Sequence, residues 1–469
     1  MPLTYRAAVD QLFSLADFER KSRANQPPDW HVKRVHRLME ILDAPHLATP
    51  VVHVAGTKGK GSTCAMVASA LSAAGYRTGF YSSPSLHRVT ERIQVDGRPI
   101  PESDFAALVD RLWPVAERIH EAGDLGVVSV FEMLTAMAFV YYRDVKADLA
   151  VIEVGLGGRL DATNVVQPAV TAITPVSLDH TSILGDSIAL IAREKAGIIK
   201  PGVPVVMSGQ FREAADVVRS VAATAQSPLT EAFETTRLVS DPTPSTSGHD
   251  VHIATATDSY RFHLPLLGLH QIDNARTAIA VLEILRDRGF SLPVDAVCRG
   301  LSGVRWPARV QLVTQGPPIV IADGAHNEQS AIALVSAIER HFPGRRGVVL
   351  VYGVTRGHDH ESTARALSQL GVRFIATQSR HPRTLDAESL AEALETVRID
   401  VQGIAATVAD ALALAKACVA PGDIVVACGS LFVAAEAIEE VTGIEPEIYP
   451  GLTGPITQPY LAAVPQPAP

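Results

Sequence analysis

Runs of consecutive apolar residues alternate with longer segments of helical periodicity through the first half of the chain. The runs have the length and apolar content of buried parallel strands, and they lie at Val51–Ala55, Thr78–Tyr81, Leu149–Val154, Val170–Thr174 and Val203–Met207. The segments of helical periodicity lie between them, notably at Phe105–Glu121, Phe131–Tyr142 and Ile188–Ala196. This order predicts a doubly wound α/β domain on a mostly parallel sheet, with its ligand at the carboxyl ends of the strands.

The pattern changes between Leu238 and Leu264, where short polar pieces rich in Thr, Ser and Pro replace the apolar runs. The alternation in HDVHIATATDSYRFHL is typical of antiparallel strands with one exposed face, so this segment predicts a small antiparallel flap. A helical pattern at Asp273–Arg288 then returns the chain to the first domain.

A second α/β series begins near Pro317. Its apolar runs alternate with alanine-rich helical patterns and lie at Ile319–Ala322, Val348–Tyr352, Arg373–Ala376 and Ile424–Ala427. The series predicts a second, smaller Rossmann-like α/β domain. We therefore divide the chain into a first domain at 1–308, a linker at 309–318 and a second domain at 319–469, with the terminal PQPAP as a frayed tail.

Composition narrows the class of protein. A length of 469 residues is too great for one core and predicts two or three domains. The formal charge of -9 argues against nucleic acid as the main partner, because a phosphate backbone requires a basic face. Neither a signal-like N-terminus nor a run of about 18 apolar residues is present, so no membrane partner is expected. The four scattered cysteines indicate no zinc site or disulfide framework and fit the reducing cytoplasm.

The stretch VVHVAGTKGKGST has the pattern of a strand, a glycine-rich turn and a helix that opens at Ser62. Three glycines let the backbone approach an oxyanion, the helix N-terminus supplies partial positive charge, and Lys60 adds a full charge. The hydroxyl of Ser62 comes one residue later than in the usual P-loop. The pattern predicts a nucleoside triphosphate site, and the alternative is a glycine turn with incidental lysines. The glycines are Gly56, Gly59 and Gly61.

Two later strand ends carry groups suited to a metal. Glu153 ends the apolar run of LAVIEVGLGGRLDATN, where P-loop enzymes hold Mg²⁺ opposite the triphosphate. Asp179 and His180 follow the next run and reach the same edge of the sheet. We therefore expect Glu153 to bind the metal, and His180 to be a second ligand or a hydrogen-bonded core residue.

The segment IAREKAGIIKPG, just downstream, predicts a helix that carries Arg193, Glu194 and Lys195. From spacing alone these residues form a solvated charged face. The pattern by itself assigns no chemistry to any of them.

Seven segments, taken in order, resemble the folylpolyglutamate synthase/dihydrofolate synthase family, which belongs to the Mur-type amide ligases. They are GTKGKGS, SSPSLHRVTERI, FEMLTAMAF, IEVGLGGRLDATN, SLDHTSILGDSI with REKAGIIKPG, LLGLHQIDNA and DGAHN. The resemblance extends from about Trp30 to Phe432 and includes the off-pattern P-loop. It implies an ATP-dependent ligase that adds L-glutamate to a carboxylate of a pteroate or folate.

The resemblance also implies roles for single residues. Lys60 would contact the β- and γ-phosphates, Ser83 and Glu153 would hold one Mg²⁺, and His180 with Glu153 would help to hold a second. Lys195 matches a lysine that is carbamylated in the family, which replaces a cation with an anion able to support the metal site. The further nucleotide contacts would be Gly56, Thr57, Lys58, Gly59, Gly61, Ser62, Asn274, Arg309, Asp323 and His326.

The implied ligands are ATP, two Mg²⁺ ions, dihydropteroate, folates and L-glutamate, bound by a cytoplasmic monomer. Asp323 and His326, from DGAHN, would also serve glutamate binding. Arg34 matches a segment that lines the pteroate pocket in bifunctional members, and Phe131 and Ser83 would belong to the same pocket. We therefore expect a bifunctional enzyme. The alternatives are a monofunctional folylpolyglutamate synthase, and for Arg34 the polar face of an ordinary amphipathic helix.

Other assignments remain open at this point. Lys58 stands where family loops commonly carry asparagine, and it is an added phosphate contact or a solvated charge. A Mur-type ligase for a nucleotide-linked sugar peptide would need an extra domain before the phosphate loop. A P-loop switch or ATPase of another class would leave DGAHN unexplained.

Overall fold

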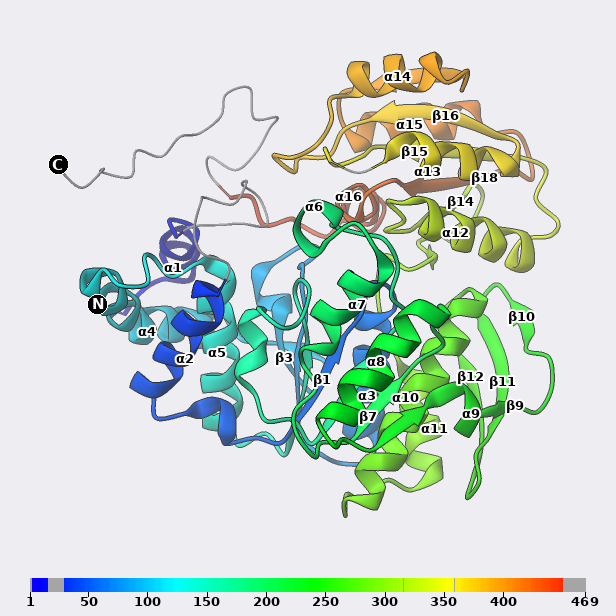
Figure 1. The fold of residues 1–469 in the computed structure, drawn as a ribbon. Coiled ribbons are helices and arrows are strands. Elements are labelled where there is room, and N and C mark those ends of the chain that lie inside the picture. The colour runs from blue at the N-terminus through cyan, green and yellow to red at the C-terminus, as the bar shows by residue number, and fades with distance from the viewer. Residues whose placement is uncertain (1, 16–28, 315, 358, 450–469) are drawn as a thin grey trace. The chain divides into compact units, whose positions relative to one another are not determined.

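The computed structural model describes residues 2–15, 29–314, 316–357 and 359–449, and it divides into two compact units (Figure 1). The first unit holds the described residues up to Arg309 together with Ser336–Pro343, and the second holds the remainder from Val310 onward. The tail PQPAP lies outside the described residues. Among the helices that are described, none is long and apolar enough to cross a membrane.

The first unit is built on a large sheet with the strand order β4-β3-β2-β5-β1-β6-β7-β8. Neighbouring strands in the series β2, β5, β1, β6, β7 and β8 pair in parallel. At one edge, β3 pairs antiparallel with both β2 and β4. All five predicted runs are strands of this sheet, which confirms the doubly wound α/β class; the short edge strands β3, β4 and β8 were not predicted. The bounds are β1 Val51–Ala55, β2 Thr78–Tyr81, β3 Ile93–Val95, β4 Arg98–Pro99, β5 Leu149–Glu153, β6 Val170–Ile173, β7 Val205–Met207 and β8 Leu229–Glu231.

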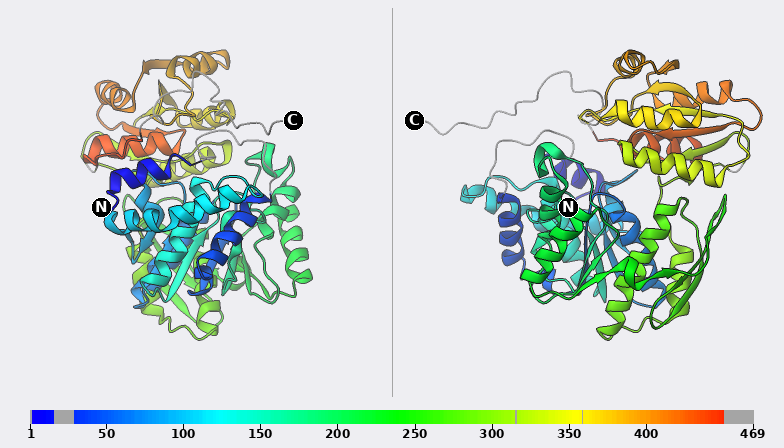
Figure 2. Two further views of the ribbon diagram at one scale, coloured as in Figure 1. Left: turned by 90° about the vertical axis from the view of Figure 1, so that its left-hand side faces the viewer. Right: turned by 45° about the vertical axis from the view of Figure 1, so that its right-hand side comes forward.

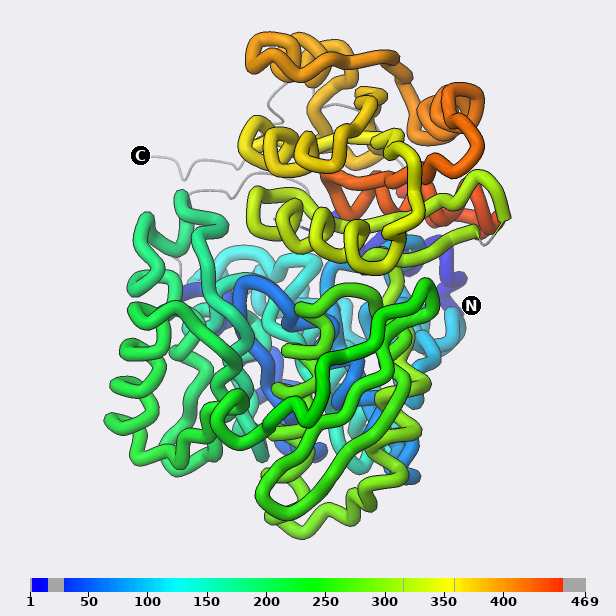
Figure 3. Tube along the Cα trace, turned by 90° about the vertical axis from the view of Figure 1, so that its right-hand side faces the viewer, coloured from blue at the N-terminus to red at the C-terminus, as the bar shows by residue number. Residues whose placement is uncertain are grey.

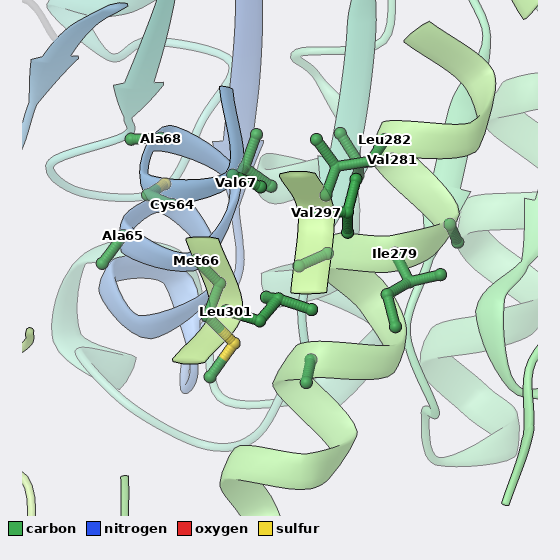
Figure 4. Close-up of a cluster of buried hydrophobic side chains, with 14 of the residues drawn as sticks. Cys64, Ala65, Met66, Val67, Ala68, Ile279, Val281, Leu282, Val297 and Leu301 are labelled. Atoms are coloured by element: carbon green, nitrogen blue, oxygen red, sulfur yellow. The ribbon is translucent and has the colours of Figure 1, made fainter. Parts of the chain in front are cut away.

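Helices cover the sheet and bury its apolar strands. α3 (Lys60–Ala73) packs against α10 (Leu269–Asp287) and α11 (Val294–Gly303), and Figure 4 shows Met66, Ile279 and Leu301 among the side chains of this core. α3 has apolar residues all round, as expected of a helix buried on every side. A separate core joins α7 (Ile188–Ala196) and α8 (Arg212–Thr224) to the strands β6 and β7.

The N-terminal helices lie beside the two helices that follow β4 (Figure 2). These are α1 (Tyr5–Leu12), α2 (Trp30–Ile41), α4 (Glu102–Ala122) and α5 (Val130–Asp144). The packing brings residues about a hundred positions apart into contact and so sets the surroundings of Arg34. The short helices of this unit are η1 Pro45–Leu47, η2 Val89–Arg92, η3 Ala162–Val165, α6 Thr181–Leu184 and α9 Ala232–Thr235.

The predicted flap is a small antiparallel sheet, seen in green in Figure 3. Buried and more exposed residues alternate along β11 and β12, as the sequence pattern required. Its hairpin is fastened to α10 through the Thr255 and Tyr260 hydroxyls, which donate to Glu283 at 2.6 and 3.2 Å. The strands are β9 Arg237–Leu238, β10 Thr243–Ser245, β11 Gly248–Ala254 and β12 Ser259–Leu264.

The second unit has the sheet order β13-β14-β18-β15-β16-β17, parallel except for β13. Residues 311–312, inside the expected linker, form β13 and pair with β14, so the second unit begins at Val310. Its strands are β13 Gln311–Leu312, β14 Ile319–Ala322, β15 Val348–Tyr352, β16 Val372–Thr377, β17 Val401–Ala405 and β18 Ile424–Cys428. Its helices are α13 His360–Leu367, η4 Ser368–Leu370, α14 Ala387–Thr396, α15 Val408–Cys418 and α16 Leu431–Thr442, together with the first part of α12 Glu328–His341, whose residues from Ser336 onward belong to the first unit.

Candidate active site

The phosphate loop, residues 56–62, connects β1 to α3. Val54 of β1 lies opposite Glu153 of β5, so the loop leaves the sheet next to the end of β5. α3 begins at Lys60, two residues earlier than the sequence indicated, because Gly59 takes a positive φ of 81° and forms the N-cap. The unpaired N–H groups of the first helical turn therefore belong to the loop, where they favour an anion.

Two side chains from distant segments press against the loop. A Cβ on Gly59 would lie 2.3 Å from Oδ1 of Asn274, and a Cβ on Gly61 would lie 2.5 Å from Cζ2 of Trp306. Any larger residue at either position would displace these neighbours. Asn274 is thus brought beside the loop by α10, while its contact with a nucleotide stays a prediction.

The loop is tied to the segment after β6 on its other side. The N–H groups of Thr57 and Lys58 both donate to the carbonyl oxygen of Pro175, at 2.9 and 3.1 Å. The Thr57 hydroxyl donates to the carbonyl oxygen of Ser177 at 3.2 Å and accepts from its N–H at 3.1 Å. These bonds hold the loop on two neighbouring strand ends.

Two lysines converge on one carbonyl of the loop. Nζ of Lys60 and Nζ of Lys195 donate to the carbonyl oxygen of Gly56 at 3.1 and 2.9 Å. Lys195 is only 4% exposed, so the solvated face predicted for its helix holds for Arg193, which is exposed, but not for Lys195. Burial, reinforced by the charge of Lys60, lowers the pKa of Lys195 to about 7.

Lys58 is held by a carboxylate. Its Nζ lies 3.1 Å from Oδ2 of Asp179, and its side chain is 26% exposed. Burial lowers the pKa of Lys58, although Asp179 acts in the opposite direction. His180, next along the chain, has a side chain that is 44% exposed and Nε2 lies 3.8 Å from the same carboxylate. Its φ of 50° is unusual for a residue with a side chain and marks a sharp turn into α6.

Glu153 has a buried carboxylate with spare bonding capacity. It is 5% exposed, and its Oε2 atom has no hydrogen-bond partner in the described part of the chain. Burial raises the pKa of Glu153, while Lys60 and Arg309 act to lower it and the N–H of Ser83 donates to it. The structure thus brings Glu153, Ser83, Lys60 and Arg309 together at the carboxyl edge of the sheet.

Arg34 lies within a buried ion pair. Its Nε and Nη2 donate to the two carboxylate oxygens of Glu132, both at 2.8 Å, and its Nη1 donates to the carbonyl oxygen of Leu125 at 2.6 Å. The side chain has no exposed surface. Burial alone would raise the pKa of Glu132, but hydrogen bonds from His31 and Arg34 outweigh it and hold the pKa below its usual value. Phe131, next to Glu132, is partly exposed at the start of α5.

The DGAHN segment lies in the second unit, directly after β14. The carboxylate of Asp323 accepts the N–H groups of Val310 and Ala325 at 2.7 and 2.8 Å, which shapes the turn. Nδ1 of His326 donates to the carbonyl oxygen of Gly324 at 2.7 Å. These bonds give both side chains a defined structural place within that unit.

Several of these neighbours were not predicted. The position of Glu132 could have been predicted from the sequence, because Ser129 and Glu132 have the spacing of a capping box. The structure forms this capping box at the start of α5. Trp306 and the Asp179 pairing with Lys58 had none, because their contacts depend on segments far apart in the chain. Within the described ranges, no group of three or more His, Cys, Asp or Glu residues is arranged to hold a metal.

Comparisons with known proteins agree with this fold. Residues 308–431 match the Mur ligase, glutamate ligase domain. A dihydrofolate synthase/folylpolyglutamate synthase of Bacillus subtilis is 34% identical over 365 residues, which cover 77% of this chain and 84% of that relative. A probable bifunctional folylpolyglutamate synthase/dihydropteroate synthase of Haloferax volcanii is 34% identical over 93% of this chain, which spans only 50% of its length.

A solved structure extends the likeness to the whole fold. The Mycobacterium tuberculosis folylpolyglutamate synthase complexed with ADP and AMPPCP matches with a TM-score of 0.85 and 32% identity, over 94% of this chain and 100% of that one. The matches in sequence and in structure cover both units. The chain therefore belongs to the folylpolyglutamate synthase/dihydrofolate synthase family of ATP-dependent Mur-type ligases.

Proposed function

We propose that this protein uses ATP to join L-glutamate to dihydropteroate, forming dihydrofolate, and to reduced folates, lengthening their glutamate chain. One observation carries the proposal: the phosphate loop, the buried carboxylate of Glu153 and the buried amine of Lys195 meet at one edge of the first sheet. Such a cluster suits the activation of a carboxylate by a triphosphate. The relative from Bacillus subtilis, which is named for both activities, supports the pair of substrates.

The chemistry explains the need for ATP. A carboxylate does not react with an amine at neutral pH, because its leaving group is poor. In the first step a carboxylate oxygen of the pterin substrate attacks the γ-phosphorus, the bond to the bridging oxygen breaks, and ADP leaves. In the second step the amine of glutamate attacks the acyl carbon and loses a proton, and inorganic phosphate leaves with the electrons of the C–O bond. One amide forms for each ATP consumed.

The phosphate loop would serve the first step. Lys60 and the N–H groups at the start of α3 supply positive charge to the β- and γ-phosphates, which reduces the repulsion between the triphosphate and the attacking carboxylate. Asn274 and Arg309 lie beside this loop and would complete the nucleotide site. Lys58 would add charge while remaining paired with Asp179.

Glu153 and Ser83 fit a magnesium ion. Glu153 has a buried oxygen without a hydrogen-bond partner among the described residues, and the N–H of Ser83 donates to the same carboxyl group. Oxygen donors are the ligands that Mg²⁺ prefers. When bound, Mg²⁺ would neutralise charge on the triphosphate. His180 is proposed for a second ion, although it is half exposed and lies beside Asp179.

Lys195 is proposed to be carbamylated. A neutral amine adds to carbon dioxide, forming an N–C bond and losing a proton, and the product is an anion. Burial lowers the pKa of Lys195 to about 7, so a large share of the amine is neutral at neutral pH. The reaction would also relieve the burial of a cation beside Lys60.

Phe131 is proposed to contact the pterin ring, and Ser83 to lie at the same pocket. Arg34 has no exposed surface and uses its guanidinium on Glu132 and Leu125, so its contribution to that pocket is indirect. It would hold the start of α5, and with it Phe131, in place. Asp323 and His326 of the second unit would serve nucleotide and glutamate binding.

The direct test is a product assay. Purified protein with ATP, Mg²⁺, glutamate and dihydropteroate should form dihydrofolate and release phosphate, and tetrahydrofolate should also accept glutamate. Lys60→Ala should form neither product. Glutamylation of tetrahydrofolate without formation of dihydrofolate would establish the second candidate, a monofunctional folylpolyglutamate synthase. Phosphate release with neither pterin would remove the folate assignment. Gel filtration would test our further proposal that the protein acts as a monomer, in the cytoplasm.

A further inference from the structure

A buried chain of hydrogen bonds runs from the middle of β1 to the turn after Glu153. Nε2 of His53 lies 2.9 Å from Oγ1 of Thr163, and that hydroxyl donates to Oδ1 of Asp161 at 2.5 Å. Because the Thr163 hydroxyl gives its single proton to Asp161, it must accept from His53, so Nε2 of His53 carries the proton. His53 and Thr163 have no exposed surface.

Asp161 connects the Thr163 hydroxyl to the backbone by accepting hydrogen bonds from several N–H groups. Its Oδ2 accepts the N–H of Leu156 at 2.9 Å, and the N–H of Gly155 is also directed to its carboxylate. Its Oδ1 accepts the N–H of Thr163 at 3.0 Å. Asp161 therefore holds the turn at Gly155 and Leu156, which begins two residues after Glu153.

Gly155 supports an aromatic side chain. A Cβ at this position would lie 2.5 Å from Cζ of Phe131, so the ring rests directly on the backbone of the turn. The ring of Tyr81 lies 6.0 Å from the ring of Phe131, centroid to centroid. A movement of the turn would therefore move Phe131 as well.

We propose that His53, Thr163 and Asp161 are positioning residues that fix Phe131 through the Gly155 turn. This rests on the proposed function, in which Phe131 contacts the pterin. The affinity for the pterin substrate then depends on the Thr163 hydroxyl, although this group does not contact the substrate. This series of hydrogen bonds begins at His53 in β1, which lies between β5 and β6. An imidazole N–H without a hydrogen-bond acceptor would be costly at this buried position.

A neighbouring threonine offers a matched control. Thr171 of β6 lies opposite His53, is as fully buried as Thr163, and its hydroxyl has no hydrogen-bond partner among the described residues. Thr163→Val and Thr171→Val therefore make the same chemical change in the same layer of the core. Only Thr163→Val removes the hydrogen bonds that connect His53 to Asp161.

The test compares these two variants and Thr163→Ser, which keeps the hydroxyl. Thr163→Val should raise the KM for dihydropteroate about tenfold while the KM for ATP stays within about twofold of the wild type. Hydrogen exchange of the Gly155 and Leu156 amides should become faster by about tenfold, because Asp161 loses one of the bonds that hold it. Thr163→Ser and Thr171→Val should match the wild type in both measurements.

A second variant, His53→Leu, keeps the proposal testable if Thr163→Val does not fold. It leaves the bond from Thr163 to Asp161 in place, so a rise in the KM for dihydropteroate smaller than that of Thr163→Val is expected. Unchanged exchange at Gly155 and Leu156 in both His53→Leu and Thr163→Val would overturn the positioning role, whatever the substrate. Equal rises in the KM for dihydropteroate and for ATP would also overturn it. If Thr163→Val shows the faster exchange but the wild type binds no dihydropteroate, the positioning role stands and the proposed dihydropteroate activity is refuted.

Discussion

Arg34 and Lys195 are both buried in the first unit, and their charges are satisfied in opposite ways. Arg34 places its guanidinium on a carboxylate through two parallel hydrogen bonds and on a carbonyl through a third. Lys195 donates to a neutral carbonyl oxygen and lies near the positive charge of Lys60. Arginine keeps its charge in any such environment, whereas lysine releases its proton when burial is not compensated. The first site is therefore a fixed ion pair, and the second is an amine whose pKa is lowered and which we propose to be carbamylated.

Lys58 falls between these two cases. It is partly buried and paired with Asp179, so its charge is only partly compensated. The three sites differ in the partner that burial leaves to each cation: a carboxylate for Arg34, a carboxylate for the partly exposed Lys58, and a neutral carbonyl for Lys195. The four predictions that follow test this comparison.

Loss of Arg34 should have the largest effect, and the effect should be on stability. Arg34→Met removes the guanidinium from the buried Glu132 carboxylate, which keeps hydrogen bonds from His31 and the Ser129 N–H, and should lower the free energy of unfolding by about 3–5 kcal/mol. Chemical denaturation followed by circular dichroism would measure this. The double variant Arg34→Met, Glu132→Met should recover most of the loss, since no charge is then left alone. A rise in the KM for the pterin without any loss of stability would show that Arg34 contacts the ligand instead.

Loss of Lys195 should act on catalysis. Lys195→Ala should lower kcat about a hundredfold, because the anion that supports the metal site would be missing. Added short carboxylates such as acetate should restore part of the activity. Arg193→Ala, on an exposed position of the same helix, is the control and should change kcat little. Full activity of the alanine variant at position 195 would rule out a carbamate role.

The reactivity of Lys195 should depend on pH. Its pKa in the folded protein is about 7, below the usual value for lysine, so the neutral amine is the main form above pH 7 and is lost as pH falls. After removal of carbon dioxide, reactivation by a fixed concentration of dissolved carbon dioxide should slow about tenfold for each pH unit below 7. The rate should level off above about pH 8, and a rate that instead goes on rising about tenfold for each pH unit up to about pH 10, as for an ordinary lysine, would contradict the lowered pKa.

Loss of Lys58 should have the smallest effect. Lys58→Ala should raise the KM for ATP about threefold, since its charge is already shared with Asp179. Lys58→Asn, with the residue common in the family, should behave alike. A rise beyond about thirtyfold would mean that Lys58 leaves Asp179 and contacts a phosphate directly.

Much of the fold could be predicted from single segments. The strands β1, β2 and β5 are mostly apolar and fully buried, and they lie inside the sheet where both faces are covered. The edge strands escaped prediction because they are short and carry polar residues; β17, for example, is VQGIA with its residues alternately exposed. The strand in residues 311–312 depends on its partner β14 and has no pattern of its own.

The sequence was enough to predict which residues form the candidate site, but not the hydrogen-bond and ion-pair partners of those residues. Glycines, Lys60 and Glu153 follow strand ends, and parallel topology brings such ends to one edge. The spacing in IAREKAGIIKPG predicted a solvated face, and only packing shows that Lys195 is buried. Arg34 was placed at a pocket by resemblance, and only packing shows its pairing with Glu132.

The sequence by itself determined the α/β class, the phosphate loop and the position of Glu153 at a strand end, because these depend on local periodicity and on residue order. The tertiary structure decided which charged groups are compensated. Burial and the distance to an opposite charge are properties of the packed chain, and both arise from segments far apart in sequence. For that reason Arg34 and Lys195, each a cation on an amphipathic helix in the sequence, differ in the folded protein: Arg34 is paired with a carboxylate, and Lys195 is a buried amine with a lowered pKa.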